Sequence, residues 1–236
     1  MSKIALVIGA GPGLGAAVAR RFAREGFSVG VVARSRDTVE PIARAIAEAG
    51  GHARAFAADV TDPDAVAALF ATVRGDLGAP DVLIYNASAF LPGSILDVSP
   101  EDFERCWKAG CYGAFLCARE VLPPMVDRGA GTILLTGATA ALRGSAKFSC
   151  LAVGKFGLRA LGQSMARELG PRGVHVAHII IDGQIDSPRA RSWAPDRAAS
   201  TFLAPDAIAE TYWQLHVQPP VAWTHEIDLR PSSESF

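Results

Sequence analysis

The chain has 236 residues, of which 50% are hydrophobic and 20% are charged, and its formal net charge is -1. This even balance gives no basic stripe that would bind nucleic acid and no acidic solvating tail. No apolar run approaches the roughly 20 residues that a membrane-spanning helix needs, so we expect no nucleic-acid partner and no membrane partner.

The N-terminus and the cysteines indicate a cellular compartment. The first three residues run directly into an apolar segment, which leaves no room for a signal peptide. The four cysteines form no C-x-x-C pair and have no zinc-site spacing, so we expect reduced thiols in a cytoplasmic protein. The five histidines are scattered, and we predict no metal site.

Short apolar runs alternate with helix-like segments along the chain. Residues 4–8 form a continuous apolar run, which is typical of a strand buried on both faces. A glycine-rich turn follows over residues 9–15, and a helix is expected over residues 14–25. Further strands are expected at residues 28–33, 53–57, 82–85, 132–136, 174–181 and 225–229. Further helices are expected at residues 38–49, 63–74, 100–109, 111–127 and 150–169.

This order of elements predicts the fold. Strands that alternate with helices imply parallel pairing through right-handed crossovers. We therefore predict an α/β protein: a single Rossmann-fold domain over residues 1–236, with a doubly wound, mostly parallel seven-stranded sheet and helices on both faces. The stretch that follows the sixth strand is the least regular. Because ligands bind outside the carboxyl ends of such strands, we expect a substrate lid over residues 183–205.

The glycine-rich turn predicts a dinucleotide site. Gly9, Gly11, Gly13 and Gly15 lie between the first strand and the first helix. Glycines at this point allow a sharp turn and let a pyrophosphate approach the backbone. The helix N-terminus, which begins at Leu14, adds N–H groups and the positive end of the helix dipole.

The end of the second strand indicates which dinucleotide binds. A carboxylate at this point would hydrogen-bond the adenosine ribose and favour NAD. The chain instead has Arg34 directly after Val32-Ala33. Because the planar guanidinium pairs well with phosphate, we predict that NADP(H) is favoured over NAD(H), with the 2′-phosphate near Arg34.

Polar and small residues at the ends of the later strands complete a known pattern. With the glycine turn, they make the chain resemble the short-chain dehydrogenase/reductase family over essentially its whole length. The residues that carry this resemblance are Asp59, Val60, Asn86, Ala87, Lys155, Gly183 and Ser187.

The resemblance implies roles for these residues and an assembly. It implies that Asp59 contacts the adenine, that the Asn86-Ala87 segment borders the cofactor and that Ser187 holds the nicotinamide amide. It also implies a homodimer or homotetramer, in which the long helices at about 103–127 and 150–169 pack against a partner.

The chain departs from the family at three of four catalytic positions. The family has Tyr-x-x-x-Lys on the long helix, a serine thirteen residues before the tyrosine and an asparagine on an earlier helix. The lysine is present as Lys155 and would bind the nicotinamide ribose. The tyrosine, serine and asparagine positions are occupied by Leu151, Ala138 and Gly110. The group that exchanges a proton with the substrate is therefore missing.

Three interpretations remain open from the sequence. The first is an oxidoreductase that uses another proton donor, for which the candidates are Asp182, Tyr112 and Thr139. The second is a cofactor-binding sensor without redox turnover, and the third is a non-redox isomerase or cyclase. Leu151, Ala138 and Phe148 are expected to make the pocket floor apolar, which suggests a small, hydrophobic substrate.

Overall fold

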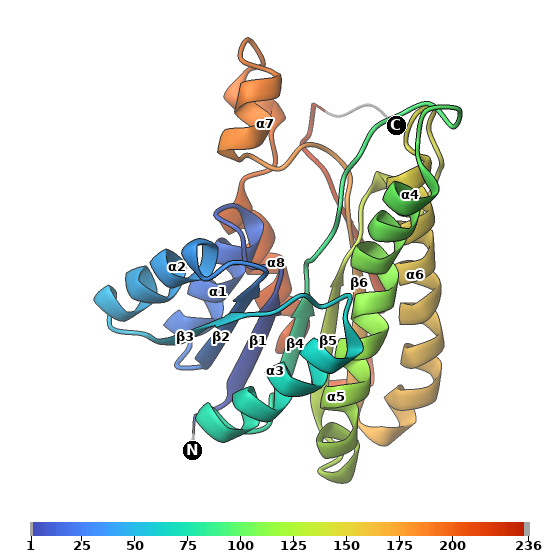
Figure 1. Cartoon of the computed structure of the whole chain (residues 1–236). Coiled ribbons are helices and arrows are strands. Elements are labelled where there is room, and N and C mark those ends of the chain that lie inside the picture. Colours follow the sequence, from blue (N-terminus) through green and yellow to red (C-terminus); the bar gives the residue numbers. More distant parts are fainter. Residues whose placement is uncertain (1, 234–236) are drawn as a thin grey trace.

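The computed structural model describes residues 2–233, apart from the side chain of Arg189. Its strands form one sheet in the order β3-β2-β1-β4-β5-β6-β7, and every pairing is parallel (Figure 1). The predicted seven-stranded sheet is therefore confirmed. The strands are β1 (Ile4–Ile8), β2 (Ser28–Ala33), β3 (His52–Ala57), β4 (Val82–Tyr85), β5 (Gly131–Thr136), β6 (Val174–Ile181) and β7 (Glu226–Leu229).

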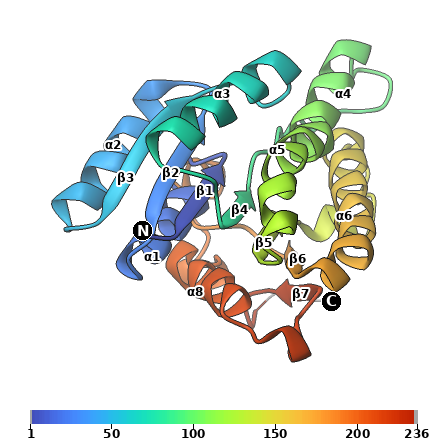
Figure 2. The same cartoon turned by 90° about the horizontal axis from the view of Figure 1, so that it is seen from below.

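Helices cover both faces of this sheet. On one face α8 packs against α1, and on the other lie α3, α5 and α6 (Figure 2). The longer helices are α1 (Leu14–Arg24), α2 (Arg36–Glu48), α3 (Pro63–Asp76), α4 (Pro100–Trp107), α5 (Gly113–Asp127), α6 (Ser149–Leu169) and α8 (Pro205–His216). In the described part of the chain, no helix has the length and apolar character needed to cross a membrane.

The apolar run of β1 shows why the strands are continuously hydrophobic. Successive side chains of a strand point to opposite faces of the sheet. Ala5 and Val7 therefore join the core beneath α1 and α8, whereas Leu6 and Ile8 join the core beneath α3 and α5. A sheet with two such cores needs apolar residues at every position of its central strands.

The expected elements end within two residues of the observed ones. The expected helices at residues 100–109 and 111–127 are joined by a π-helical turn, Lys108–Tyr112, so the chain stays helical through this region. Two helices were not predicted, α8 and the short α7 (Pro188–Trp193). The first of them, α8, could have been found. Its buried residues Ile208, Ala209, Tyr212 and Leu215 follow helical spacing after Pro205, and this pattern is visible in the sequence.

Residues 183–205 are more regular than expected from their sequence. They contain a short helix, α7 (Pro188–Trp193), and a 3-10 turn, Ala199–Thr201. An isolated parallel β-bridge between Ile185 and Leu203 joins the two ends of the segment. The segment stands above the carboxyl ends of the strands, opposite the start of α4 (Figure 1).

Candidate functional site

The glycine turn is held against the end of β4. Gly9 has a φ of +81°, and a Cβ at this position would lie 2.5 Å from the backbone nitrogen of Ala87. The Asn86 side-chain amide donates a hydrogen bond to the Gly9 carbonyl oxygen at 2.9 Å. The Gly9 and Ala10 N–H groups both donate to the Val32 carbonyl, each at 2.9 Å. The structure thus brings together Gly9, Asn86 and Ala87, as the sequence predicted.

Of the other glycines of the turn, Gly11 leaves room for a ligand. A Cβ on Gly15 would lie 2.6 Å from the Ala10 Cα, so this glycine allows close packing, whereas a Cβ on Gly11 would meet nothing within 4 Å. Helix α1 begins at Leu14, and no side chain caps its N-terminus at Gly13. An open backbone face beside an uncapped helix N-terminus fits a pyrophosphate.

Arg34 and Asp59 lie together beyond β2 and β3. Arg34 is exposed and forms no hydrogen bond or salt bridge with the other described residues. The Asp59 carboxylate accepts hydrogen bonds from the Thr61 N–H at 2.9 Å and the Thr61 hydroxyl at 2.8 Å. These bonds, with a smaller contribution from the charge of Arg34, lower the pKa of Asp59. Val60 is buried, and a Cβ on Gly113 would lie 2.8 Å from its carbonyl oxygen.

The start of the 183–205 segment approaches the glycine turn. Gly183 has a φ of +145°, a conformation that favours glycine. Ser187 caps α7, because its hydroxyl accepts a hydrogen bond from the Ala190 N–H at 3.1 Å. A Cβ on Gly13 would lie 3.6 Å from the Ser187 Cβ, so Ser187 lies next to the glycine turn.

Lys155 lies buried on α6 behind the cofactor edge. Only 4% of the residue is exposed, and its Nζ donates a hydrogen bond to the Thr136 carbonyl at 2.6 Å. Burial without a carboxylate partner lowers the pKa of Lys155 to about 8. The lysine does not line the cavity described next, although Leu151, one helical turn earlier, does.

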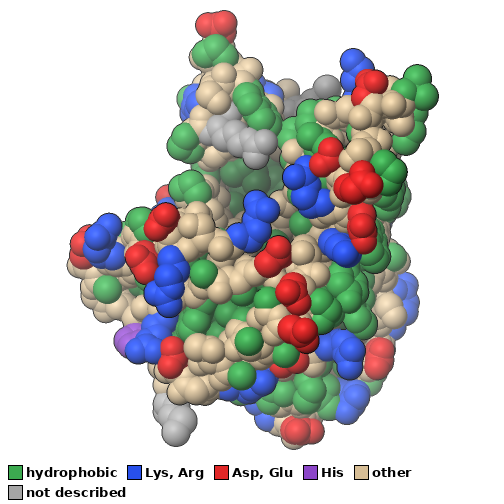
Figure 3. All heavy atoms as spheres, in the orientation of Figure 1, with side chains coloured by type: hydrophobic (Ala, Val, Ile, Leu, Met, Phe, Trp, Pro, Cys, Tyr) green, Lys and Arg blue, Asp and Glu red, His purple; other side chains and the backbone are tan. Residues whose placement is uncertain are grey.

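A cavity of about 640 Å³ opens between α7 and the start of α6. The molecule is hollowed between α7 and the start of α4, with hydrophobic side chains on both sides (Figure 3). Ala138, Phe148 and Leu151 all line the cavity, together with charged and polar residues. The lining residues are Phe90, Pro92, Ala138, Thr139, Ala140, Arg143, Ser145, Phe148, Leu151, Ile181, Asp182, Gly183, Gln184, Trp193 and Arg197.

Two of the three candidate proton donors meet at the base of this cavity. The Thr139 hydroxyl donates a hydrogen bond to Asp182 Oδ1 at 2.5 Å. The other Asp182 oxygen forms a salt bridge of 3.0 Å with Arg230, which also contacts Asp228 at 2.8 Å. Sequence reasoning missed Arg230, because it directly follows the last strand and belongs to no motif.

Gly110 and Tyr112 lie away from the cavity. Gly110 is in the π-helical turn, where a Cβ would lie 3.1 Å from the Gly154 Cα of α6. This glycine pair lets the two helices approach closely. The Tyr112 ring stacks between Trp107 and Phe115, with centroid distances of 5.6 Å and 6.3 Å. The structure therefore does not bring Tyr112 to Thr139 and Asp182.

Comparisons with known proteins agree with this architecture. The family described as short chain dehydrogenase matches residues 3–198. Sorbitol-6-phosphate 2-dehydrogenase of Escherichia coli K12 is 33% identical over 215 residues, which cover 90% of this chain and 83% of that protein.

Solved structures match over almost the whole chain. A short-chain dehydrogenase from Rhodopseudomonas palustris has a TM-score of 0.83 and 38% identity, with 98% of each chain covered. A metagenomic short-chain oxidoreductase in complex with NADP has a TM-score of 0.85 and 27% identity, also with 98% of each chain covered. These matches include the last strands and the 183–205 segment.

Proposed function

The chain belongs to the short-chain dehydrogenase/reductase family, and on that premise we propose that it is an NADP(H)-dependent oxidoreductase. Its substrate is a small, hydrophobic carbonyl compound, alcohol or related reducible molecule. The observation that carries this proposal is the glycine turn, which Asn86 holds against β4 through Gly9 and which leaves Gly11 open beside a helix N-terminus without a side-chain cap.

The described residues fit a nicotinamide dinucleotide. The open face of Gly11 and the N-terminus of α1 would bind the pyrophosphate. Arg34, exposed at the end of β2, would bind the 2′-phosphate, which supports NADP(H) over NAD(H). A related metagenomic oxidoreductase of 27% identity was crystallised with NADP. When bound, the cofactor would supply the hydride chemistry.

We further propose that the catalytic tetrad is degenerate. Leu151 and Ala138 line the cavity but carry no hydroxyl, and Gly110 packs against Gly154 instead of reaching the cavity. Of the tetrad only Lys155 remains, and we assign it to binding the nicotinamide ribose from the end of β5, where its Nζ donates to the Thr136 carbonyl. A positioned acid or base contributes roughly 10²–10⁴-fold to rate, so turnover needs a substitute.

Thr139 and Asp182 together are the substitute that the geometry favours. When a substrate hydroxyl gives its proton to Thr139 Oγ1, Thr139 can pass its own proton to Asp182 Oδ1 along their hydrogen bond. Arg230 holds the other Asp182 oxygen and would keep the carboxylate oriented. In the reductive direction the same protons move the opposite way.

A cofactor-binding protein without redox turnover is the second candidate. The observation that favours it is that Leu151 and Ala138, which line the cavity, cannot transfer protons, whereas Asn86 still donates its hydrogen bond to the glycine turn at Gly9. Such a protein would bind NADP(H) as a sensor.

We also propose a homodimer or homotetramer in the cytoplasm. The large apolar side chains of Trp107, Phe115, Val153 and Phe156 are exposed on the joined α4–α5 helix and on α6. Contact with a second copy would remove this apolar surface from water. The four cysteines are all free thiols, which supports a reducing compartment.

The test begins with binding and continues to turnover. Purified protein is titrated with NADPH and with NADH, followed by nucleotide fluorescence. NADPH oxidation is then measured across aldehydes, ketones, imines and activated alkenes. The proposal expects tighter NADPH than NADH binding and turnover with at least one class, which Asp182→Asn reduces. Tight binding without any turnover would favour the sensor, and absence of binding would refute both candidates.

A further inference from the structure

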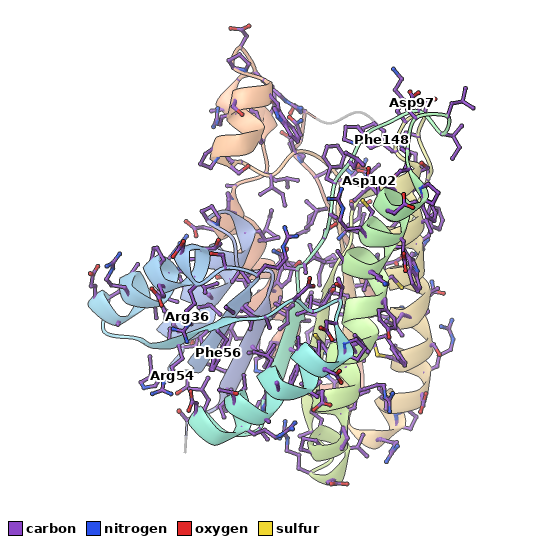
Figure 4. All side chains as sticks on the ribbon, in the orientation of Figure 1. Arg36, Arg54, Phe56, Asp97, Asp102 and Phe148 are labelled. Carbon is purple, nitrogen blue, oxygen red and sulfur yellow. The ribbon has the colours of Figure 1, made fainter. Side chains whose placement is uncertain are left out.

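Three aromatic rings from three separate segments form one wall of the cavity. Phe90 follows β4, Phe148 precedes α6 and Trp193 ends α7. The Phe90 ring lies 5.6 Å from that of Phe148 and 5.7 Å from that of Trp193, with interplanar angles of 43° and 44°. Figure 4 shows Phe148 above α6, on the side of the hollow that faces α7. The wall therefore joins the segment 183–205 to the body of the protein.

One cationic group at this cavity is available to a ligand. Arg143 lines the cavity and is exposed, and its guanidinium forms no hydrogen bond or salt bridge within residues 2–233, although its backbone N–H donates to the Thr139 carbonyl at 3.2 Å. The other lining arginine, Arg197, donates to Gln184 and to Thr201, each at 2.9 Å. The lining carboxylate, Asp182, is already engaged by Thr139 and Arg230.

These charges decide which ligand suits the aromatic wall. A cluster of aromatic rings can bind either a flat aromatic group or an organic cation. A cation in this cavity would face two arginines, and its lining carboxylate is already neutralised by a salt bridge. An aromatic anion would instead find both a stacking surface and the guanidinium of Arg143.

We propose that this cavity selects a planar aromatic substrate that carries an acidic group. The ring packs against Phe90, Phe148 and Trp193, and the acidic group pairs with Arg143. The volume of about 640 Å³ accommodates one or two fused rings, within the usual range for small-molecule sites. This inference rests on the proposed function for its reaction, but it predicts ligand binding that is measurable without turnover.

Calorimetry with three matched probes tests separately whether the cavity prefers an aromatic ring and whether it prefers an acidic group. The probes are 2-naphthoate, an aromatic anion; naphthalene-2-methanol, a neutral aromatic; and octanoate, an aliphatic anion. Each is titrated into the full chain, with and without saturating NADP+. We expect 2-naphthoate to bind about tenfold more tightly than either other probe. Equal binding of octanoate or of naphthalene-2-methanol would overturn the proposal.

Two variants and one control assign the effects to residues. Arg143→Gln should abolish the preference for naphthoate over naphthalene-2-methanol, and Phe90→Leu should abolish the preference over octanoate. Arg172→Gln removes an exposed arginine that does not line the cavity and should leave all three affinities unchanged. If Phe90→Leu does not fold, Trp193→Leu on exposed α7 replaces it. Unchanged preferences in Arg143→Gln would contradict the assignment.

NADPH titration of the same preparations separates the two proposals. NADPH binding without a naphthoate preference overturns the substrate class and leaves the proposed function standing. A naphthoate preference without NADPH binding supports the ligand site and refutes the proposed function.

Discussion

The proposed cofactor site and the proposed proton-transfer site of this molecule differ in how closely their residues match the family's pattern. The cofactor region, residues 4–34 and 82–87, keeps the glycine turn, its anchor Asn86 and an exposed Arg34. The proton-transfer region, residues 136–155 and 181–187, has Ala138 and Leu151 where hydroxyls are expected. Because the glycine turn and Arg34 lie on other strands and helices than Ala138 and Leu151, the proposal expects dinucleotide binding to be kept where proton transfer has changed.

The largest effect is expected from filling the space beneath Gly9. Gly9→Ala would place a Cβ 2.5 Å from Ala87 at a φ of +81°. We expect a loss of about 3 kcal/mol in the free energy of unfolding and loss of NADPH binding. Gly26→Ala is the matched control, because Gly26 has a φ of +82° but open space around it. It should cost only about 1 kcal/mol, as measured by urea denaturation, and equal losses would contradict the packing argument.

Lys155→Met should raise the stability of the protein and weaken its binding of NADPH. Burial lowers the pKa of Lys155 from 10.5 to about 8, so folding disfavours the charged lysine. Burying the charged lysine therefore costs about 3 kcal/mol of the free energy of folding. This cost is fully present below pH 8 and disappears as the pH rises towards 10.5. The variant also loses the hydrogen bond to the Thr136 carbonyl, which reduces the expected gain in stability by about 1 kcal/mol.

The variant should therefore be about 2 kcal/mol more stable than the native protein at pH 7, with a smaller difference at pH 10. Its affinity for NADPH should fall by about tenfold, since a hydrogen-bonding ammonium is lost from the ribose site. Urea denaturation at both pH values and nucleotide titration measure the two effects. A variant that is less stable at pH 7 would show that the buried charge is not costly.

Arg34→Ala should change which nucleotide is preferred. Removal of a charged hydrogen bond to the 2′-phosphate should weaken NADPH binding by about 10- to 100-fold and leave NADH binding unchanged. Arg36→Ala is the control, because Arg36 lies on α2 and forms a salt bridge of 3.1 Å with Glu40 (Figure 4). If Arg34→Ala weakened the binding of NADPH and of NADH equally, this arginine would not be the group that binds the 2′-phosphate.

The same contrast explains what could be predicted from the sequence. The strands were predictable from buried runs such as Ile4–Ile8, and so was the gathering of the residues that directly follow them at one sheet edge. The substitute partners were only partly predictable. Thr139 and Asp182 could be named, but Arg230 reaches Asp182 from the end of the chain.

Contacts between distant loops also left no pattern in the sequence. The ring of Phe90 meets that of Trp193 across about a hundred residues of chain, and Gly110 meets Gly154 through helix packing. Such contacts depend on how the helices and loops dock after the sheet has formed, and local periodicity does not encode them.

Restoring the missing hydroxyls tests the central claim most directly. The double variant Leu151→Tyr, Ala138→Ser and the native protein are compared for NADPH affinity and for turnover of simple ketones. The account predicts equal NADPH affinity and turnover about 100-fold faster in the double variant, since a positioned proton donor is regained. Equally fast or faster turnover by the native protein, with the same affinity, would contradict the claim that its proton-transfer region is degenerate.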